Sequence, residues 1–215
     1  MSIANTLVHL PEHGPPKLLY LLLHGVGATA EHMAPLAQRL AHAYPQAAVL
    51  CLNGPDAFDA VIDGAAARQW FSIRRIDEAN RPARVAAALP HLIATVRELQ
   101  TRFGVAWQRT ALAGFSQGAV MALEAVQAEP HLAGCVLAFA GRHASLPTRR
   151  PVDVTVHLLH GMDDAVIPYQ ASVESAQRLV ALGSDVTADV LPGIGHELHA
   201  ALIDRAIEQL QTRLR

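Results

Sequence analysis

Apolar residues along this chain gather in short runs separated by longer segments of mixed character. Six of these runs have the length of a strand and lack a sustained apolar–polar alternation; they span 17–23, 47–52, 110–113, 135–138, 152–159 and 186–191. Runs of this kind are typical of strands that are buried on both faces, as in a parallel sheet. The pattern therefore predicts a mostly parallel sheet built from these segments.

The segments between the runs carry the periodicity of amphipathic helices. In residues 31–43, Met33, Leu36, Ala37 and Leu40 fall on one helical face. Similar patterns span 82–103, 117–128, 170–182 and 197–214. Strands that alternate with helices indicate an α/β fold with right-handed crossovers, in which helices flank the central sheet.

The chain length limits the domain organisation. The 215 residues, of which 51% are hydrophobic and 17% charged, suit one domain over residues 1–215 and are too apolar for a disordered chain. Most linkers are short, so we expect no separate cap domain. The exception is 53–81, a stretch of 29 residues without clear periodicity. Long irregular segments in compact domains are usually functional loops.

Charge and cysteine content narrow the function classes. The formal net charge is −2 and no basic cluster is longer than two residues, so we expect no nucleic-acid partner. Cys51 and Cys135 lie in apolar runs and are expected to be buried free thiols. The N-terminus lacks a signal-peptide pattern, and no apolar run approaches the roughly 18 residues of a membrane span. We therefore expect a cytoplasmic protein without stable membrane insertion.

The sharpest chemical signal is Gly114-Phe115-Ser116-Gln117-Gly118, which matches G-x-S-x-G. An apolar run precedes it and a helical segment rich in Ala, Val and Met follows, which is the strand–turn–helix context of a nucleophile elbow. The glycines leave room where a side chain would meet the neighbouring strand or helix. We therefore expect Ser116 to be a nucleophile on a strained turn.

A serine nucleophile needs a base, and in this arrangement an acid and then a histidine follow it in the chain. The acid is expected just after the run 152–159, where Asp163 and Asp164 are adjacent, and the residues alone do not separate the two. Only His196 and His199 lie beyond this point. His196 is the expected base because it lies in a glycine-rich loop, whereas His199 is expected inside the last helix.

Acyl transfer also needs N–H donors for the developing oxyanion, and loss of one donor typically lowers the rate by about 10²–10³. The first expected donor is the backbone N–H of Gln117, next to the serine. The second is that of Val26, in the loop Leu23-His24-Gly25-Val26-Gly27 that follows an early predicted strand. His24 is expected to hold this loop by a hydrogen bond rather than to carry a proton.

Three other hypotheses use overlapping residues. Residues 25–30 fit the G-x-G-x-x-A pattern of an NAD(P)-binding oxidoreductase, but the next predicted strand ends without the acidic residue that binds the ribose. His196-Glu197-Leu198-His199 is similar to a zinc-hydrolase motif, but its histidines are three rather than four residues apart. A non-catalytic binding protein on the same fold is the third alternative, although no catalytic residue is missing.

Four segments, spread in order over nearly the whole chain, resemble the phospholipase/carboxylesterase family, which includes acyl-protein thioesterases and small bacterial carboxylesterases. They are 23–27, 114–118, 160–168 and 195–196. The stretches 69–73 and 78–82 further resemble its bacterial YpfH-like esterase branch. The family pattern H-G-x-x-D-x-x-V-P assigns the acid to Asp164, and the family's oxyanion residues fall on Val26 and Gln117. Ala28 and Ser72 depart from the family, where acidic residues are common at both positions.

The resemblance implies an α/β-hydrolase fold and a serine hydrolase that needs no cofactor or metal. Its partner is a small-molecule carboxylic ester or acyl thioester, cleaved through an acyl-enzyme by Ser116, Asp164 and His196. The irregular loop is expected to form one wall of the acyl groove, with Trp70 and Phe71 as apolar substrate-binding surface. Packing of Trp70 in the core is the alternative.

Overall fold

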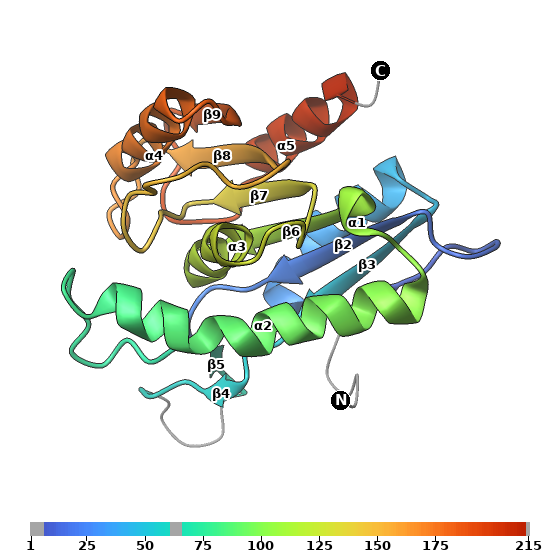
Figure 1. Ribbon diagram of the computed structural model, residues 1–215, viewed down its shortest axis with the longest axis horizontal. Helices are drawn as coiled ribbons and strands as arrows, with labels where there is room; N and C mark the ends of the chain where they lie inside the picture. Colours follow the sequence, from blue (N-terminus) through green and yellow to red (C-terminus); the bar gives the residue numbers. More distant parts are fainter. Residues whose placement is uncertain (1–6, 61–65, 214–215) are drawn as a thin grey trace.

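A seven-stranded sheet lies at the centre of the computed structural model, which describes residues 7–60 and 66–213 (Figure 1). The strand order is β1-β3-β2-β6-β7-β8-β9, and every pair is parallel except β1 with β3. The strands are β1 (Leu7–His9), β2 (Leu18–Leu23), β3 (Ala47–Leu52), β6 (Thr110–Phe115), β7 (Cys135–Phe139), β8 (Thr155–Gly161) and β9 (Asp185–Leu191). The mostly parallel sheet expected from the apolar runs is therefore confirmed.

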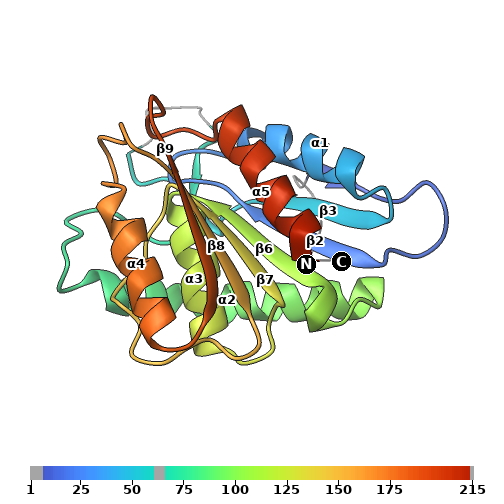
Figure 2. The same ribbon diagram turned by 90° about the horizontal axis from the view of Figure 1, so that it is seen from above.

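Helices cover both faces of the sheet (Figure 2). One layer contains α2 (Arg81–Phe103), α3 (Gln117–Ala128) and α4 (Gln170–Ala181), and the other contains α1 (Ala34–Ala43) and α5 (Ala200–Arg213). A short 3-10 helix at Ala30–Met33 precedes α1, and another at Trp107–Arg109 precedes β6. Among the described residues, no helix has both the length and the apolar character needed to cross a bilayer.

The two layers enclose two hydrophobic clusters, one on each face of the sheet. In β2, Leu19, Leu21 and Leu23 belong to the cluster under α2 and α3, whereas Tyr20 and Leu22 belong to the cluster under α1 and α5. All five are buried, which is why the run shows no polar alternation. Burial of each leucine contributes about 1.5–3 kcal/mol.

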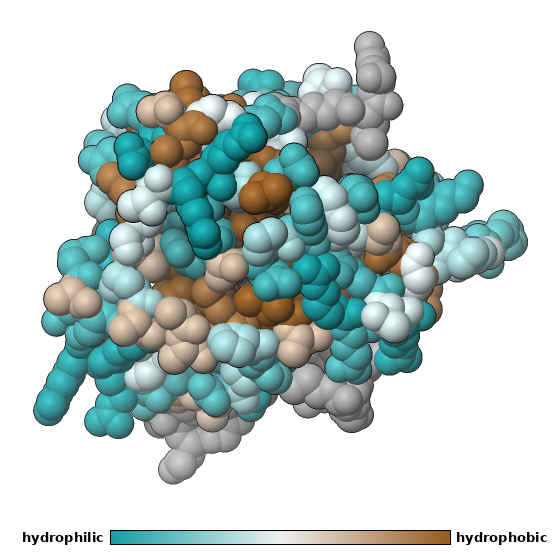
Figure 3. All heavy atoms as spheres, viewed as in Figure 1, coloured by the Kyte–Doolittle hydropathy of each residue, from teal (hydrophilic) through white to brown (hydrophobic). Residues whose placement is uncertain are grey.

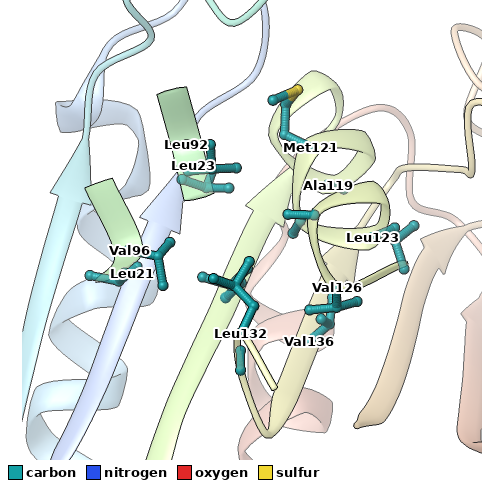
Figure 4. Packing of buried hydrophobic residues seen from close by; sticks show 14 of the residues in the cluster. Leu21, Leu23, Leu92, Val96, Ala119, Met121, Leu123, Val126, Leu132 and Val136 are labelled. Carbon is teal, nitrogen blue, oxygen red and sulfur yellow. The ribbon is translucent and has the colours of Figure 1, made fainter. Parts of the chain in front are cut away.

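The first cluster is seen from close by in Figure 4, where Leu23 and Leu21 lie next to Leu92 and Val96 of α2. Outside, hydrophilic residues cover most of the face that carries α2, and hydrophobic residues are visible mainly in the recesses between them (Figure 3). The helices of this layer thus turn an apolar side toward the sheet and a polar side toward solvent, as their periodicity predicted.

Several details differ from the sequence prediction. β8 begins at Thr155 rather than Val152, because Asp153 lies in a turn at φ +54°. α5 begins at Ala200 rather than Glu197, after a bend that contains His196. β9 is the edge strand and is mostly half-buried, so the expectation that it is buried on both faces is wrong.

Three short strands escaped the sequence analysis. β1 is antiparallel and only three residues long. β4 (Asp56–Ala57) and β5 (Arg68–Gln69) form a separate antiparallel pair within the irregular segment 53–81. Two or three residues are too few to show a periodicity. Neither Cys51 nor Cys135 forms a disulfide, and Cys135 is only half-buried, less than expected.

Candidate active site

Ser116 occupies the sharp turn between β6 and α3. Its backbone adopts φ +53° and ψ −115°, a left-handed conformation that is rare for a residue with a side chain. The Ser116 N–H donates to the carbonyl of Phe139 over 2.9 Å, and the Ser116 carbonyl accepts N–H groups of α3. The structure therefore confirms the strained turn that the motif predicted.

Close backbone contacts explain the two glycines of the motif. A Cβ atom on Gly114 would lie 2.2 Å from the carbonyl oxygen of Gly118. A Cβ atom on Gly118 would lie 2.1 Å from the carbonyl oxygen of Leu23, at the end of β2. Both distances are below any tolerated contact, so each position excludes every side chain. The expected reason for the glycines is confirmed.

A hydrogen-bonded line connects Ser116, His196 and Asp164. His196 Nε2 lies 2.9 Å from Ser116 Oγ, and His196 Nδ1 lies 2.7 Å from Asp164 Oδ2. A carboxylate oxygen only accepts, so Nδ1 carries the proton and Nε2 is free to accept the serine proton. His196 also packs against the ring of Phe115, with 5.0 Å between the ring centroids. The structure thus brings together the three side chains that the sequence analysis selected.

Asp164 is buried, whereas the adjacent Asp163 is exposed. Burial alone would raise the pKa of Asp164, but hydrogen bonds from His196 and from the N–H groups of Ile167 and Val166 outweigh it, so the pKa is lowered. The carboxylate is therefore ionised at neutral pH. The residues alone left the choice between the two aspartates open. The burial of Asp164 and its contact with His196 agree with the family pattern, which selects Asp164.

The loop after β2 lies directly beside the serine. A Cβ atom on Gly25 would come within 3.3 Å of Ser116 Cβ. The Gly27 N–H donates to the carbonyl of Arg68, and the Arg68 N–H donates to the carbonyl of Ala28, both over 2.9 Å. The Val26 N–H is not paired with any acceptor among the described residues. The Gln117 N–H is the first of α3, where amides have no acceptor within the helix.

His24 holds this loop from behind. It is fully buried, its Nε2 accepts the Gly54 N–H over 2.9 Å, and its Nδ1 lies 2.6 Å from the Gly25 carbonyl. Because Nε2 accepts, the proton is on Nδ1 and is donated to Gly25. Burial lowers the pKa of His24, so the ring is neutral. The expected structural role of His24 is confirmed.

Trp70 and Phe71 are buried in the cluster under α2, at 3% and 7% exposure. Both also line an open depression with Ser72 and residues of α2. The Trp70 indole N–H donates to the His24 carbonyl over 2.9 Å. The structure thus shows core packing for both residues, and Trp70 is in addition a hydrogen-bond support for the loop that carries Val26.

The side chain of Gln117 was not singled out from the sequence. Its Oε1 accepts the Trp70 N–H over 2.8 Å, and its Nε2 donates to the Phe71 carbonyl over 2.7 Å. The buried amide thereby replaces a strand partner for this backbone. No local pattern could have revealed this pairing, because the partners lie 46 and 47 residues apart in the chain.

His199 lies just before α5, not inside it as expected, and its Nδ1 accepts the N–H of Ala201. His196 uses both ring nitrogens for Ser116 and Asp164. The two histidines of the zinc-like motif therefore have separate partners. In residues 7–60 and 66–213, no group of three or more His, Cys, Asp or Glu side chains is arranged to hold a metal ion.

Comparisons with known proteins agree on one family. The model of the phospholipase/carboxylesterase family matches residues 6–214. The chain is 41% identical to esterase YpfH of Escherichia coli, over 92% of this chain and 83% of that protein. It is 26% identical to acyl-protein thioesterase 1 of Cryptococcus neoformans, over 85% and 83% of the two chains.

Solved structures show the same fold. The crystal structure of esterase PE8 superposes with a TM-score of 0.88 at 27% identity, covering 97% of this chain and 98% of that one. The carboxylesterase of Bacillus cereus superposes with a TM-score of 0.78 at 18% identity, covering 96% and 93%. The α/β-hydrolase fold expected from the sequence is therefore confirmed.

The two adjacent aspartates provide a matched pair of variants. Asp164→Asn should lower kcat for a p-nitrophenyl ester by about 10⁴, because an amide holds the wrong tautomer of the histidine. Asp163→Asn should change kcat by less than about twofold, because this side chain is exposed. Steady-state kinetics on both variants check this. Equal losses would contradict the assignment of Asp164.

The hydrogen bond from Trp70 to His24 can be removed with little change in ring packing. Trp70→Phe leaves a buried carbonyl without its donor, at a cost of about 1–3 kcal/mol. If the loop that carries Val26 relaxes, kcat should fall about tenfold with little change in KM. Trp107→Phe, at the chain's other tryptophan, is the control and should leave kcat unchanged. A Trp70→Phe enzyme with unaltered kcat would show that this support is dispensable.

Proposed function

The chain belongs to the phospholipase/carboxylesterase family, and from this premise we propose that it cleaves carboxylic esters or acyl thioesters through an acyl-enzyme on Ser116. The observation that carries the proposal is the 2.9 Å hydrogen bond between Ser116 Oγ and His196 Nε2, at the turn where β6 meets α3. Because the chain belongs to this family and its relatives are esterases, the oxidoreductase hypothesis is not supported.

In the first half of the proposed reaction, Ser116 Oγ attacks the carbonyl carbon of the substrate while His196 Nε2 takes the serine proton. Asp164 stabilises the imidazolium that forms and keeps its orientation. The negative charge moves to the carbonyl oxygen, which receives hydrogen bonds from the N–H groups of Val26 and Gln117. Collapse of this intermediate expels the alcohol or thiol, which takes the proton from His196.

In the second half, water attacks the acyl-enzyme and His196 again acts as the base. The acid is released and Ser116 regains its proton. The same side chains serve an ester and a thioester, because both substrates pass through a tetrahedral intermediate of the same kind and give the same acyl-enzyme. The proposal therefore covers both substrate classes.

The proposed acyl groove lies beside the segment 53–81, of which residues 61–65 lie outside the described residues. Trp70 and Phe71 line an open depression in this region. Their hydrogen bonds to His24 and Gln117 support a role in holding the wall of the groove. We assign them the proposed task of shaping the groove, with direct contact limited to their small exposed edges.

Replacement of the nucleophile is the direct test. Ser116→Ala should lower p-nitrophenyl ester turnover by about 10⁴-fold or more, because no other group forms the acyl-enzyme. Ser175→Ala, at another buried serine, is the control and should remain active. Circular dichroism checks that both variants fold. Activity of Ser116→Ala above about a hundredth of the wild type would refute the proposal, since the acyl-enzyme requires its hydroxyl.

The pH dependence of kcat/KM should show a single ionisation on the acid side of its profile. The lowered pKa of Asp164 keeps it ionised, and burial lowers the pKa of His160 so that it stays neutral; both shifts move those protonations to lower pH. Loss of activity on the acid side should then reflect protonation of the base in the proposed mechanism, because a protonated base cannot accept the serine proton. A plot of log(kcat/KM) against pH should fall with a limiting slope of one. A slope of two, or a flat profile, would show that a different set of groups titrates.

A further inference from the structure

A second histidine touches the carboxylate of Asp164. His160, near the end of β8, is fully buried, and its Nε2 lies 3.1 Å from Asp164 Oδ2. The same nitrogen lies 2.8 Å from the carbonyl oxygen of Ile167. The oxygen of Asp164 that receives His196 Nδ1 therefore also faces a histidine that the proposed reaction does not use.

The partners of His160 determine where its proton lies. A carboxylate and a backbone carbonyl can only accept, so Nε2 carries the hydrogen and shares it between Asp164 and Ile167. Nδ1 lies 2.7 Å from the hydroxyl of Ser172, a buried residue at the start of α4. Burial lowers the pKa of His160, so the ring is neutral and Nδ1 accepts. The Ser172 hydroxyl hydrogen is shared between Nδ1 and the carbonyl oxygen of Gly141, which lies 3.2 Å from Ser172 Oγ.

These contacts close a small ring of hydrogen bonds around the turn that carries Asp164. Asp164 Oδ1 accepts the N–H groups of Val166 and Ile167, each over 2.8 Å. His160 binds the carbonyl of the same Ile167 and the other oxygen of Asp164. The turn is thus tied to β8 through His160 and, through Ser172, to α4.

We propose that His160 is a positioning residue, whose Nε2–H holds the 164–167 turn and Asp164 Oδ2 in line with His196. This inference rests on the proposed function of Asp164. His160 acts on the carboxylate and its turn, not on substrate. An apolar residue of similar size would fill the space but would leave the Ile167 carbonyl without its donor, and the carboxylate would be free to shift.

A pair of substitutions separates hydrogen bonding from packing. His160→Leu keeps apolar volume and removes the donor; it should lower kcat by about 10- to 100-fold with little change in KM, because small misplacements of catalytic groups have effects of this size. His160→Gln offers an amide N–H to the same oxygens and should restore most of kcat. The measurement is steady-state turnover of a p-nitrophenyl ester, with thermal melting to count folded enzyme.

His157 provides the matched control on the same strand. It is buried on the opposite face of β8, where its Nδ1 lies 2.8 Å from the hydroxyl of Thr187. His157→Leu should leave kcat per folded molecule unchanged. If His160→Leu also leaves kcat unchanged, or if His160→Gln loses as much as His160→Leu, the proposal is overturned.

A double-mutant cycle shows whether His160 acts through Asp164. In an Asp164→Ala background, His160→Leu should cause no further loss of kcat, because the group that it positions is absent. Independent, additive losses would overturn the proposal. If His160→Leu does not fold, Ser172→Ala takes its place in the cycle; it should lower kcat in the wild type and have no effect without Asp164, and additive losses would again overturn the proposal. Activity of Ser116→Ala above about a hundredth of the wild type would instead contradict the proposed function itself.

Discussion

Ser116 adopts φ +53°, a conformation that costs a residue with a side chain about 1–3 kcal/mol. The surrounding structure holds it there: Phe139 accepts its N–H, and the Ser116 carbonyl accepts the N–H groups of Ala119 and Val120. Gly118 lets α3 approach the end of β2 so closely that no Cβ fits. The position of Oγ is therefore set by backbone packing before any substrate arrives, and the rest of the site is arranged around it.

The parallel sheet explains how distant segments reach this point. The loops after β2, β6, β8 and β9 all leave the carboxyl edge of the sheet, where ligands of open α/β sheets bind. They carry Val26, Ser116, Asp164 and His196 in that order along the chain. Two hydrophobic clusters pack against the two faces of the sheet that carries these loops. The sheet is therefore a rigid support for the residues at its carboxyl edge.

Buried polar contacts lie on both sides of the proposed catalytic groups. On one side, Gln117 Oε1 accepts the backbone N–H of Trp70, and the His24 carbonyl accepts the indole N–H of the same residue. These contacts link the loop of Val26 to α3, which begins after Ser116. On the other side, His160 binds the turn of Asp164. Buried polar groups of this kind are costly unless paired, and their pairing leaves a single arrangement for the atoms above them.

The sequence by itself determined the elements and the chemistry that depend on local pattern. Continuous apolar runs identified the strands, because burial on both faces leaves no room for polar alternation. The glycines on either side of Ser116 identified the turn, since a Cβ atom at either position would lie 2.2 Å or 2.1 Å from a backbone oxygen. Chain order left His196 and His199, and the glycine-rich loop around His196 favoured this residue. The family pattern, not the local residues, selected Asp164 over Asp163.

The tertiary structure alone decided what depends on partners far apart in the chain. It placed Asp164 inside and Asp163 outside, and it showed that Trp70, for which core packing was one of two predictions, is buried and supports the loop of Val26. It also left β9 half-buried, because an edge strand lacks a neighbour on one side. The physical reason is the same in each case. Periodicity reports how far a segment is buried, whereas hydrogen-bond partners and the position of a strand in its sheet are set by the packing of the whole chain.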